Sequence, residues 1–159
     1  MLTESQLDRV WERKLAAEVR SLYFADFTNR YSRRKQAITF VTFSLSSGAA
    51  ATIIGKAPSW VPIVLSVIVA VLTAYSVAIG LERLVRTMAK LHYSWNQITT
   101  DYDRLWNHTY EDQAESEFED LLRRERDLSE LASTEAPNDQ KAIGKWQDHV
   151  FRQYHLNNA

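Results

Sequence analysis

The fold is decided by the stretch WVPIVLSVIVAVLTAYSVAIGL (residues 60–81) and by the ERLVRTMAKLHYSWNQITTDYDRL (residues 82–105) that continues it. The first part has 22 residues without a formal charge, which is long enough to cross a bilayer as an α-helix. The second part is polar, but its apolar residues continue at alternating steps of four and three, a spacing that keeps one side of a helix facing a partner. This seam consists of Val77, Leu81, Leu84, Met88, Leu91, Trp95, Ile98, Tyr102 and Leu105. We therefore predict one continuous helix, a membrane span that runs into a coiled-coil-like cytosolic stalk.

A weaker uncharged run precedes this stretch. Residues 37–55 hold 19 positions without a charge, but they include several Ser and Thr side chains. The run lies a few residues before the stronger one, so we predict a hairpin of two spans, 37–55 and 60–81.

Basic residues flank the predicted hairpin. Four of them, Arg30, Arg33, Arg34 and Lys35, come directly before the first span. Three more, Arg83, Arg86 and Lys90, follow the second span, and the short connector has a single lysine, Lys56. Positive charge marks the cytoplasmic side of a bacterial inner membrane. Both termini are therefore expected in the cytoplasm.

The composition narrows the class of protein. Residues 91–159 hold 7 Lys and Arg against 14 Asp and Glu, so a nucleic-acid partner is not expected. The chain has no Cys, only 4 Gly and 3 Pro among its 159 residues, which favours an all-α fold without disulfides. A further alternative is a soluble helical bundle with a very hydrophobic central hairpin.

Helices are also predicted on both sides of the hairpin. We expect an amphipathic helix over 4–31, a helix over about 112–132 and a turn at 133–139. A last helix, over about 139–155, is expected to be capped by Asn138 or Asp139. The expected organisation is 1–36 as the N-terminal helix with its basic flank, 37–82 as the transmembrane hairpin, and 83–159 as a cytosolic stalk and bundle. The N-terminal helix either lies on the membrane surface or docks its apolar stripe on the stalk.

Small and hydroxylated residues on the spans are candidates for a pore lining or for close helix packing. In the first span they form two faces, and in the second a thinner line. They are Thr39, Thr42 and Ser46 on one face, Ser44, Gly48 and Thr52 on the other, and Ser66 and Thr73 in the second span. The alternative is that each hydroxyl only bonds its own helix backbone.

Glu82 is the one acidic residue beside the apolar middle of the chain. In an oligomer a ring of Glu82 side chains would favour cations at the cytoplasmic mouth of a pore. The alternative is a pair within one helix, between Glu82 and Arg86 at i,i+4.

The sequence offers no catalytic residue, metal site or cofactor site. The four histidines have no metal-ligand spacing, and no phosphate-binding glycine loop or nucleophile motif is present. We therefore expect that the protein is not an enzyme.

The stretch LERLVRTMAKLHYSWNQITTDYDRLW (81–106), together with the helix, basic cluster and hairpin before it, resembles the SLATT domain family. The likeness extends from about Trp11 to Trp146, and its most family-like short text is Tyr102-Asp103-Arg104-Leu105-Trp106. These are small two-transmembrane effectors associated with bacterial nucleotide-signalling defence systems.

The resemblance implies an oligomeric effector of the cytoplasmic membrane that opens a pore or disrupts the bilayer during anti-phage defence, killing or arresting the infected cell. It also implies a sensor, either a cytosolic partner or a nucleotide-signalling protein, because no sensing domain is evident in this chain. The rival interpretation is a non-conducting anchor that recruits a cytosolic partner through its helical bundle. Whether the seam packs within one chain or between chains is left open.

Overall fold

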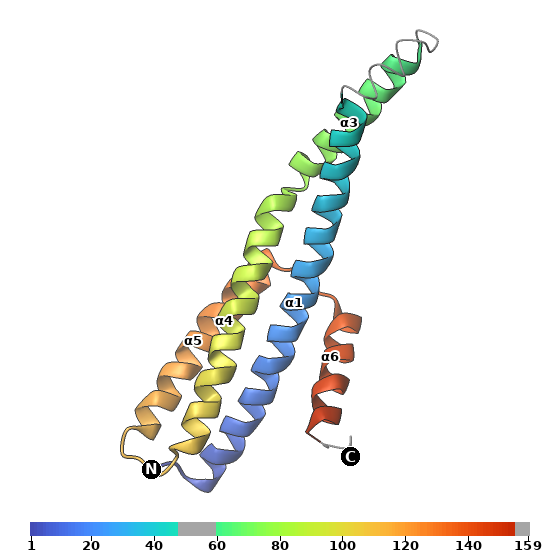
Figure 1. The fold of residues 1–159 in the computed structure, drawn as a ribbon. Helices are drawn as coiled ribbons and strands as arrows, with labels where there is room; N and C mark the ends of the chain where they lie inside the picture. The colour runs from blue at the N-terminus through green and yellow to red at the C-terminus, as the bar shows by residue number, and fades with distance from the viewer. Residues whose placement is uncertain (48–59, 155–159) are drawn as a thin grey trace. The chain divides into compact units, whose positions relative to one another are not determined.

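The computed structural model describes residues 1–47 and 60–154, and every regular element in this part of the chain is an α-helix (Figure 1). This confirms the predicted all-α class. The helices are α1 (Glu4–Ser46), α3 (Trp60–Ala78), α4 (Leu81–Asn107), α5 (Ala114–Glu135) and α6 (Gln140–Gln153).

The chain divides into two compact units. One combines Met1–Thr28 with Arg86–Ala159, and we call it the bundle. The other is Asn29–Val85, which we call the apolar unit. Both α1 and α4 contribute residues to each unit.

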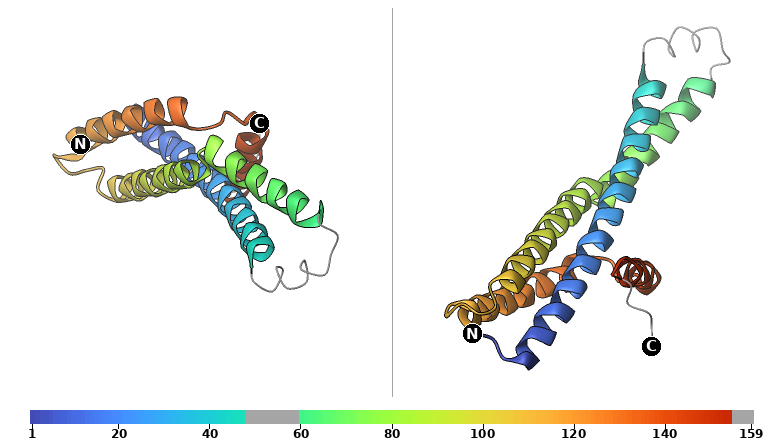
Figure 2. Two further views of the ribbon diagram at one scale, coloured as in Figure 1. Left: turned by 90° about the horizontal axis from the view of Figure 1, so that it is seen from above. Right: turned by 60° about the horizontal axis from the view of Figure 1, so that its bottom comes forward.

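The bundle is built around the N-terminal part of α1, with α4, α5 and α6 packed on it. Figure 1 shows α5 beside α4, and α6 beside α1. The start of the chain lies against the turn between α4 and α5 in both views of Figure 2, where Leu2 N donates a hydrogen bond of 3.0 Å to Thr109 O. The N-terminal helix thus packs within the bundle, but its apolar stripe docks mainly on α6 rather than on the stalk, because Leu15 and Val19 form a buried cluster with Val150 of α6.

The heptad seam of α4 forms the centre of the bundle core. Six seam residues of α4 are completely buried. They are Met88, Leu91, Trp95, Ile98, Tyr102 and Leu105. Alternating steps of three and four place all six on one side of the helix, so each faces α1 or α5 rather than solvent.

The connection between α5 and α6 follows the predicted turn chemistry. Asp139 caps α6, because its Oδ1 accepts hydrogen bonds of 3.1 Å from both Lys141 N and Ala142 N. This confirms Asp139 as a capping residue and satisfies two backbone donors that have no partner inside the helix.

The predicted continuous helix over 60–105 is wrong. The helix α3 ends at Ala78 and α4 begins at Leu81, with a two-residue turn at Ile79 and Gly80 between them. The physical reason is Gly80, whose φ of 62° is the left-handed conformation that terminates helices and that residues with a Cβ rarely adopt. Val77 belongs to the heptad pattern but precedes this turn, and its side chain is 75% exposed.

The first predicted span also differs from the structure. Residues 37–46 are not a separate helix but the end of α1, which continues from Glu4 to Ser46 without a break, and residues 48–55 lie outside the described part. Within the described residues, one stretch is long and apolar enough to cross a membrane, and it lies inside Ile63–Asn107, the range that holds most of α3 and all of α4.

Candidate functional site

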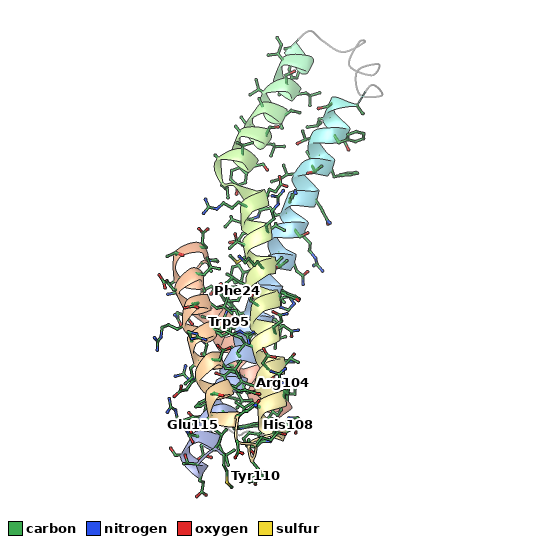
Figure 3. All side chains as sticks on the ribbon, turned by 90° about the vertical axis from the view of Figure 1, so that its left-hand side faces the viewer. Phe24, Trp95, Arg104, His108, Tyr110 and Glu115 are labelled. Atoms are coloured by element: carbon green, nitrogen blue, oxygen red, sulfur yellow. The ribbon has the colours of Figure 1, made fainter. Side chains whose placement is uncertain are left out.

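The surface of α3 is the most apolar surface in the described part of the apolar unit. No residue of α3 from Ile63 to Ala78 is buried, and the side chains of α3 project outward from the helix in Figure 3. Exposed large side chains include Trp60, Ile63, Val67, Val71 and Tyr75. A core helix of a soluble protein would be covered by its own chain, whereas this helix is not.

The predicted hydroxyl residues of the spans lie mostly at exposed positions. Thr39, Ser44, Ser46, Ser66 and Thr73 are exposed, while Thr42 is partly buried and its Oγ1 has no hydrogen-bond partner. Gly48 and Thr52 lie outside the described residues. On α3 a shallow groove runs along Ile63, Ser66, Val67 and Ala70, and it includes Ser66 but not Thr73 of the predicted span residues. In one copy of the chain this groove is open.

Glu82 pairs across two helices of the apolar unit. The Glu82 Oε1 atom lies 3.9 Å from Lys35 Nζ, and both side chains are about half exposed. Lys35 belongs to the basic cluster that precedes the first predicted span. The carboxylate therefore lies among cations at the charged end of this unit, in a position that solvent reaches.

In the bundle, a buried carboxylate holds three helices together. Glu125 of α5 is 3% exposed. Its Oε1 accepts hydrogen bonds from Arg13 Nη1 at 3.1 Å and Arg20 Nη1 at 2.8 Å, both on α1. Its Oε2 accepts a bond of 3.1 Å from the hydroxyl of Tyr102 on α4. Burial, followed by the neighbouring Glu125 charge, raises the pKa of Tyr102 well above its ordinary value.

A second polar cluster joins α1, α4 and α6. Lys14 Nζ lies 2.5 Å from Asp103 Oδ1, and its side chain is 9% exposed. The same ammonium group lies 4.9 Å from the ring centre of Trp11 and 5.1 Å from that of Tyr154. Burial lowers the pKa of Lys14, but the Asp103 carboxylate outweighs it and the pKa is raised overall. Tyr154 in turn donates a hydrogen bond of 3.0 Å to Glu18 Oε2.

An apolar pocket of about 510 Å³ opens between α1, α5 and α6. Phe24 and Trp95, both labelled in Figure 3, lie in its wall at the same level of the bundle. Further apolar walls come from α1, α5 and α6, through Leu15, Val19, Ala132, Ile143 and Phe151. Tyr23 closes one side, because its hydroxyl donates to Pro137 O and accepts from Asp139 N.

Sequence reasoning named Tyr102 and Trp95 as seam residues, but it missed the charged residues of both polar clusters and the pocket itself. Glu125 continues the apolar stripe of its helix, since it follows Leu121 by four positions and Phe118 by seven. A carboxylate on the buried side of a helix is a signal for a polar core cluster that pattern reading could have used. The pocket has no such signal, because it depends on how α6 packs against α1.

Two further observations concern possible metal sites in the described residues and similarity to known proteins. In residues 1–47 and 60–154, no three His, Asp or Glu side chains are grouped so that they could hold a metal ion. No protein-family model, curated protein or solved structure matches the sequence.

Proposed function

We propose that this chain is a two-span protein of the bacterial cytoplasmic membrane, of the SLATT type, with both termini in the cytoplasm. Copies of it assemble into an oligomer that opens a pore in the bilayer as an effector of anti-phage defence. The trigger comes from a cytosolic sensor or a nucleotide-signalling partner. The first span is residues 37–55, and the second span is α3.

The observation that carries this proposal is the uncovered apolar surface of α3. The helix has 19 residues and is therefore about 28 Å long at 1.5 Å per residue. That length is close to the hydrocarbon thickness of a bilayer. Exposing such a surface to water is costly, while lipid or a second copy would cover it.

The pore itself would be built from residues that one copy leaves open. Exposed hydroxyls at Ser46, Ser66 and Thr73 offer polar groups on otherwise apolar helices. Oligomerisation places copies of these groups around an axis, and Glu82 would then form a charged ring at the cytoplasmic end. One hairpin cannot enclose a channel, so assembly is part of the proposal.

The test is ion flux through liposomes that contain the purified chain. We expect cation flux in the native protein, and a Glu82→Gln variant should lose cation preference while its cross-linked oligomer stays the same. Glu130→Gln, an exposed acidic position of the bundle, is the matched control and should leave the selectivity unchanged. An absence of flux from a protein that is oligomeric and inserted would reject a constitutively open pore. If ion flux is still absent after extract from infected cells is added, pore formation is rejected.

A second candidate function is the non-conducting anchor, and the observation in its favour is the well-formed bundle with its own pocket. Here, substitutions in the spans that keep hydrophobicity, such as Ser66→Ala, would have no effect on toxicity in cells. Changes to the bundle at Phe118 or Trp146 would abolish it. The pore proposal expects the opposite sensitivity in the spans, so one toxicity assay with both sets of variants distinguishes the two.

A further inference from the structure

We propose that the bundle pocket binds a free single-chain amphiphile with a carboxylate head group, such as a medium- or long-chain fatty acid. This site is separate from the pore residues, since every residue that lines it belongs to the bundle. Three properties of the pocket support this assignment: its shape, its apolar walls and the positive charge toward one end.

The pocket is elongated along α1. Its wall on this helix begins at Glu12 and ends at Phe24, and the positions between them recur at steps of three and four. Three turns of one helix face correspond to a length of about 18 Å. A volume of about 510 Å³ over this length suits an extended chain better than a compact, multi-ring ligand.

The walls are apolar at the centre. Val19, Phe24 and Phe151 come from two of the helices that line the pocket, α1 and α6. Val19 also belongs to the buried cluster on which Phe151 packs. An alkyl chain placed here would exchange water for apolar contact along its whole length, whereas a highly charged ligand would lose its hydration.

The charge lies toward one end. Arg20 forms part of the pocket wall, and its guanidinium lies 4.6 Å from the ring centre of Trp95. Arg13 and Arg20 share the single carboxylate of Glu125, so this cluster has one positive charge in excess. The Arg20 side chain is 42% exposed and can therefore donate to a ligand as well. Glu12 lies two turns away and disfavours an anion at the other end, which fixes the direction of the ligand.

The experiment titrates a dansyl-labelled undecanoate into the full chain in lipid nanodiscs, with empty nanodiscs as the blank. Energy transfer from tryptophan to the dansyl group detects the probe that is bound to the protein. Trp95 can act as a donor because it lies in the pocket wall. Saturable binding is expected, and unlabelled fatty acids should displace the probe with an affinity that rises about fourfold for each added CH₂ group. Displacement by laurate but not by lysophosphatidylglycerol would support a free carboxylate. The reverse order would assign the pocket to membrane lipid and overturn the proposal.

One variant with its control tests the pocket, and another variant with its control tests the role of charge. Ala132→Phe places a ring in the cavity and should abolish saturable binding, whereas Ala89→Phe, at an exposed site of α4 outside the lining, should not. Arg20→Gln should weaken carboxylate binding at least about tenfold and leave a fatty alcohol of the same length unaffected. Arg152→Gln, an exposed position on α6, is the matched control.

Because Arg20 also contacts Glu125, its replacement could disturb the bundle. Gln147→Glu avoids this difficulty, since Gln147 is an exposed residue of the pocket wall. It should weaken the carboxylate selectively by adding a negative charge. Equal binding by the native chain and the Ala132→Phe variant would overturn the pocket assignment. Equal weakening of carboxylate and alcohol by Gln147→Glu would overturn the role of charge.

Discussion

Glu125 shows how a single charged residue can organise a helical core. The surrounding α5 sequence is highly charged, yet this one carboxylate is buried and accepts hydrogen bonds from two helices. Its arginine partners are 46% and 42% exposed, so water compensates part of their charge when the carboxylate is lost. Loss of the carboxylate should therefore destabilise the bundle by less than the breaking of a fully buried ion pair would.

Replacing the members of this cluster should destabilise the bundle in a definite order. Glu125→Gln is expected to lower the free energy of unfolding by about 2 kcal/mol, and Tyr102→Phe by about 1 kcal/mol, because the phenol contributes one hydrogen bond and the carboxylate accepts three. Denaturant unfolding followed by near-UV circular dichroism measures both. The exposed Glu130→Gln serves as the control and should change stability by less than about 0.5 kcal/mol. Equal effects at Glu125 and Glu130 would contradict this role.

Alkaline pH should weaken the bundle. The pKa values of Tyr102, Tyr154 and Lys14 are all raised in the folded chain. A raised pKa means that the folded state binds more protons than the unfolded state above the ordinary value, so the stabilisation is complete below that pH and declines as pH increases. The free energy of unfolding is thus expected to decrease from about pH 9 upward. In the double variant Tyr102→Phe, Tyr154→Phe the decrease should be shallower, and an unchanged slope would reject these tyrosines as its source.

At the level of the helix, Gly80 determines where α3 stops. An added Cβ would meet nothing closer than Arg83 Cβ at 4.0 Å, so space does not require glycine here. The positive φ does. The turn therefore depends on backbone conformation rather than on packing.

Gly80→Ala should favour a helix that continues through the turn. The left-handed conformation is about 1–2 kcal/mol less favourable for a residue with a Cβ, whereas alanine adopts the right-handed conformation of a continuous helix without this strain. Spin labels at Ala74 and Arg83, both exposed, would report the distance across the turn by pulsed electron resonance. We expect a shift toward the single distance of a straight helix. Ala78→Ser, a neighbouring change without this backbone demand, should leave the distribution as it is.

Periodicity identified the helices well but could not locate their breaks. The seam residues from Met88 to Leu105 are buried, as their regular spacing predicted. Asp139 caps α6, as its residue type and position before the helix predicted. The turn at Gly80 was missed because the apolar steps of four and three pass through it unchanged. The end of the first helix was misplaced for the opposite reason, since the change from charged to apolar residues near Ala37 does not interrupt the backbone of α1.

The whole molecule combines a bundle that covers its own core with a unit that leaves its apolar side chains open. The bundle core depends on contacts between residues far apart in the sequence, such as Tyr154 with Glu18 and Tyr23 with Asp139. Such contacts and the pocket beside them have no periodic signature. They could therefore not be predicted from one sequence.

Membrane attachment should depend on α3. Arginines at Val67 and Val71 together would place two charges on one exposed face, at a cost of about 2.5–3.5 kcal/mol each near the bilayer centre. This variant is expected to leave the carbonate-washed membrane fraction. The control pair Tyr93→Arg, Gln97→Arg has the same spacing on the exposed side of α4 in the bundle and should stay in the membrane. Retention of both pairs would show that α3 does not hold the protein there.

The burial of Lys14 also has a chemical consequence. An amine reacts with acylating reagents only as the free base, and this one is covered by aromatic rings and kept protonated by Asp103. The exposed Lys141 and Lys145 should be acylated quickly, whereas Lys14 should be labelled orders of magnitude more slowly. The rate of labelling at Lys14, followed by mass spectrometry, therefore reports how often α1 separates from α4 or α6.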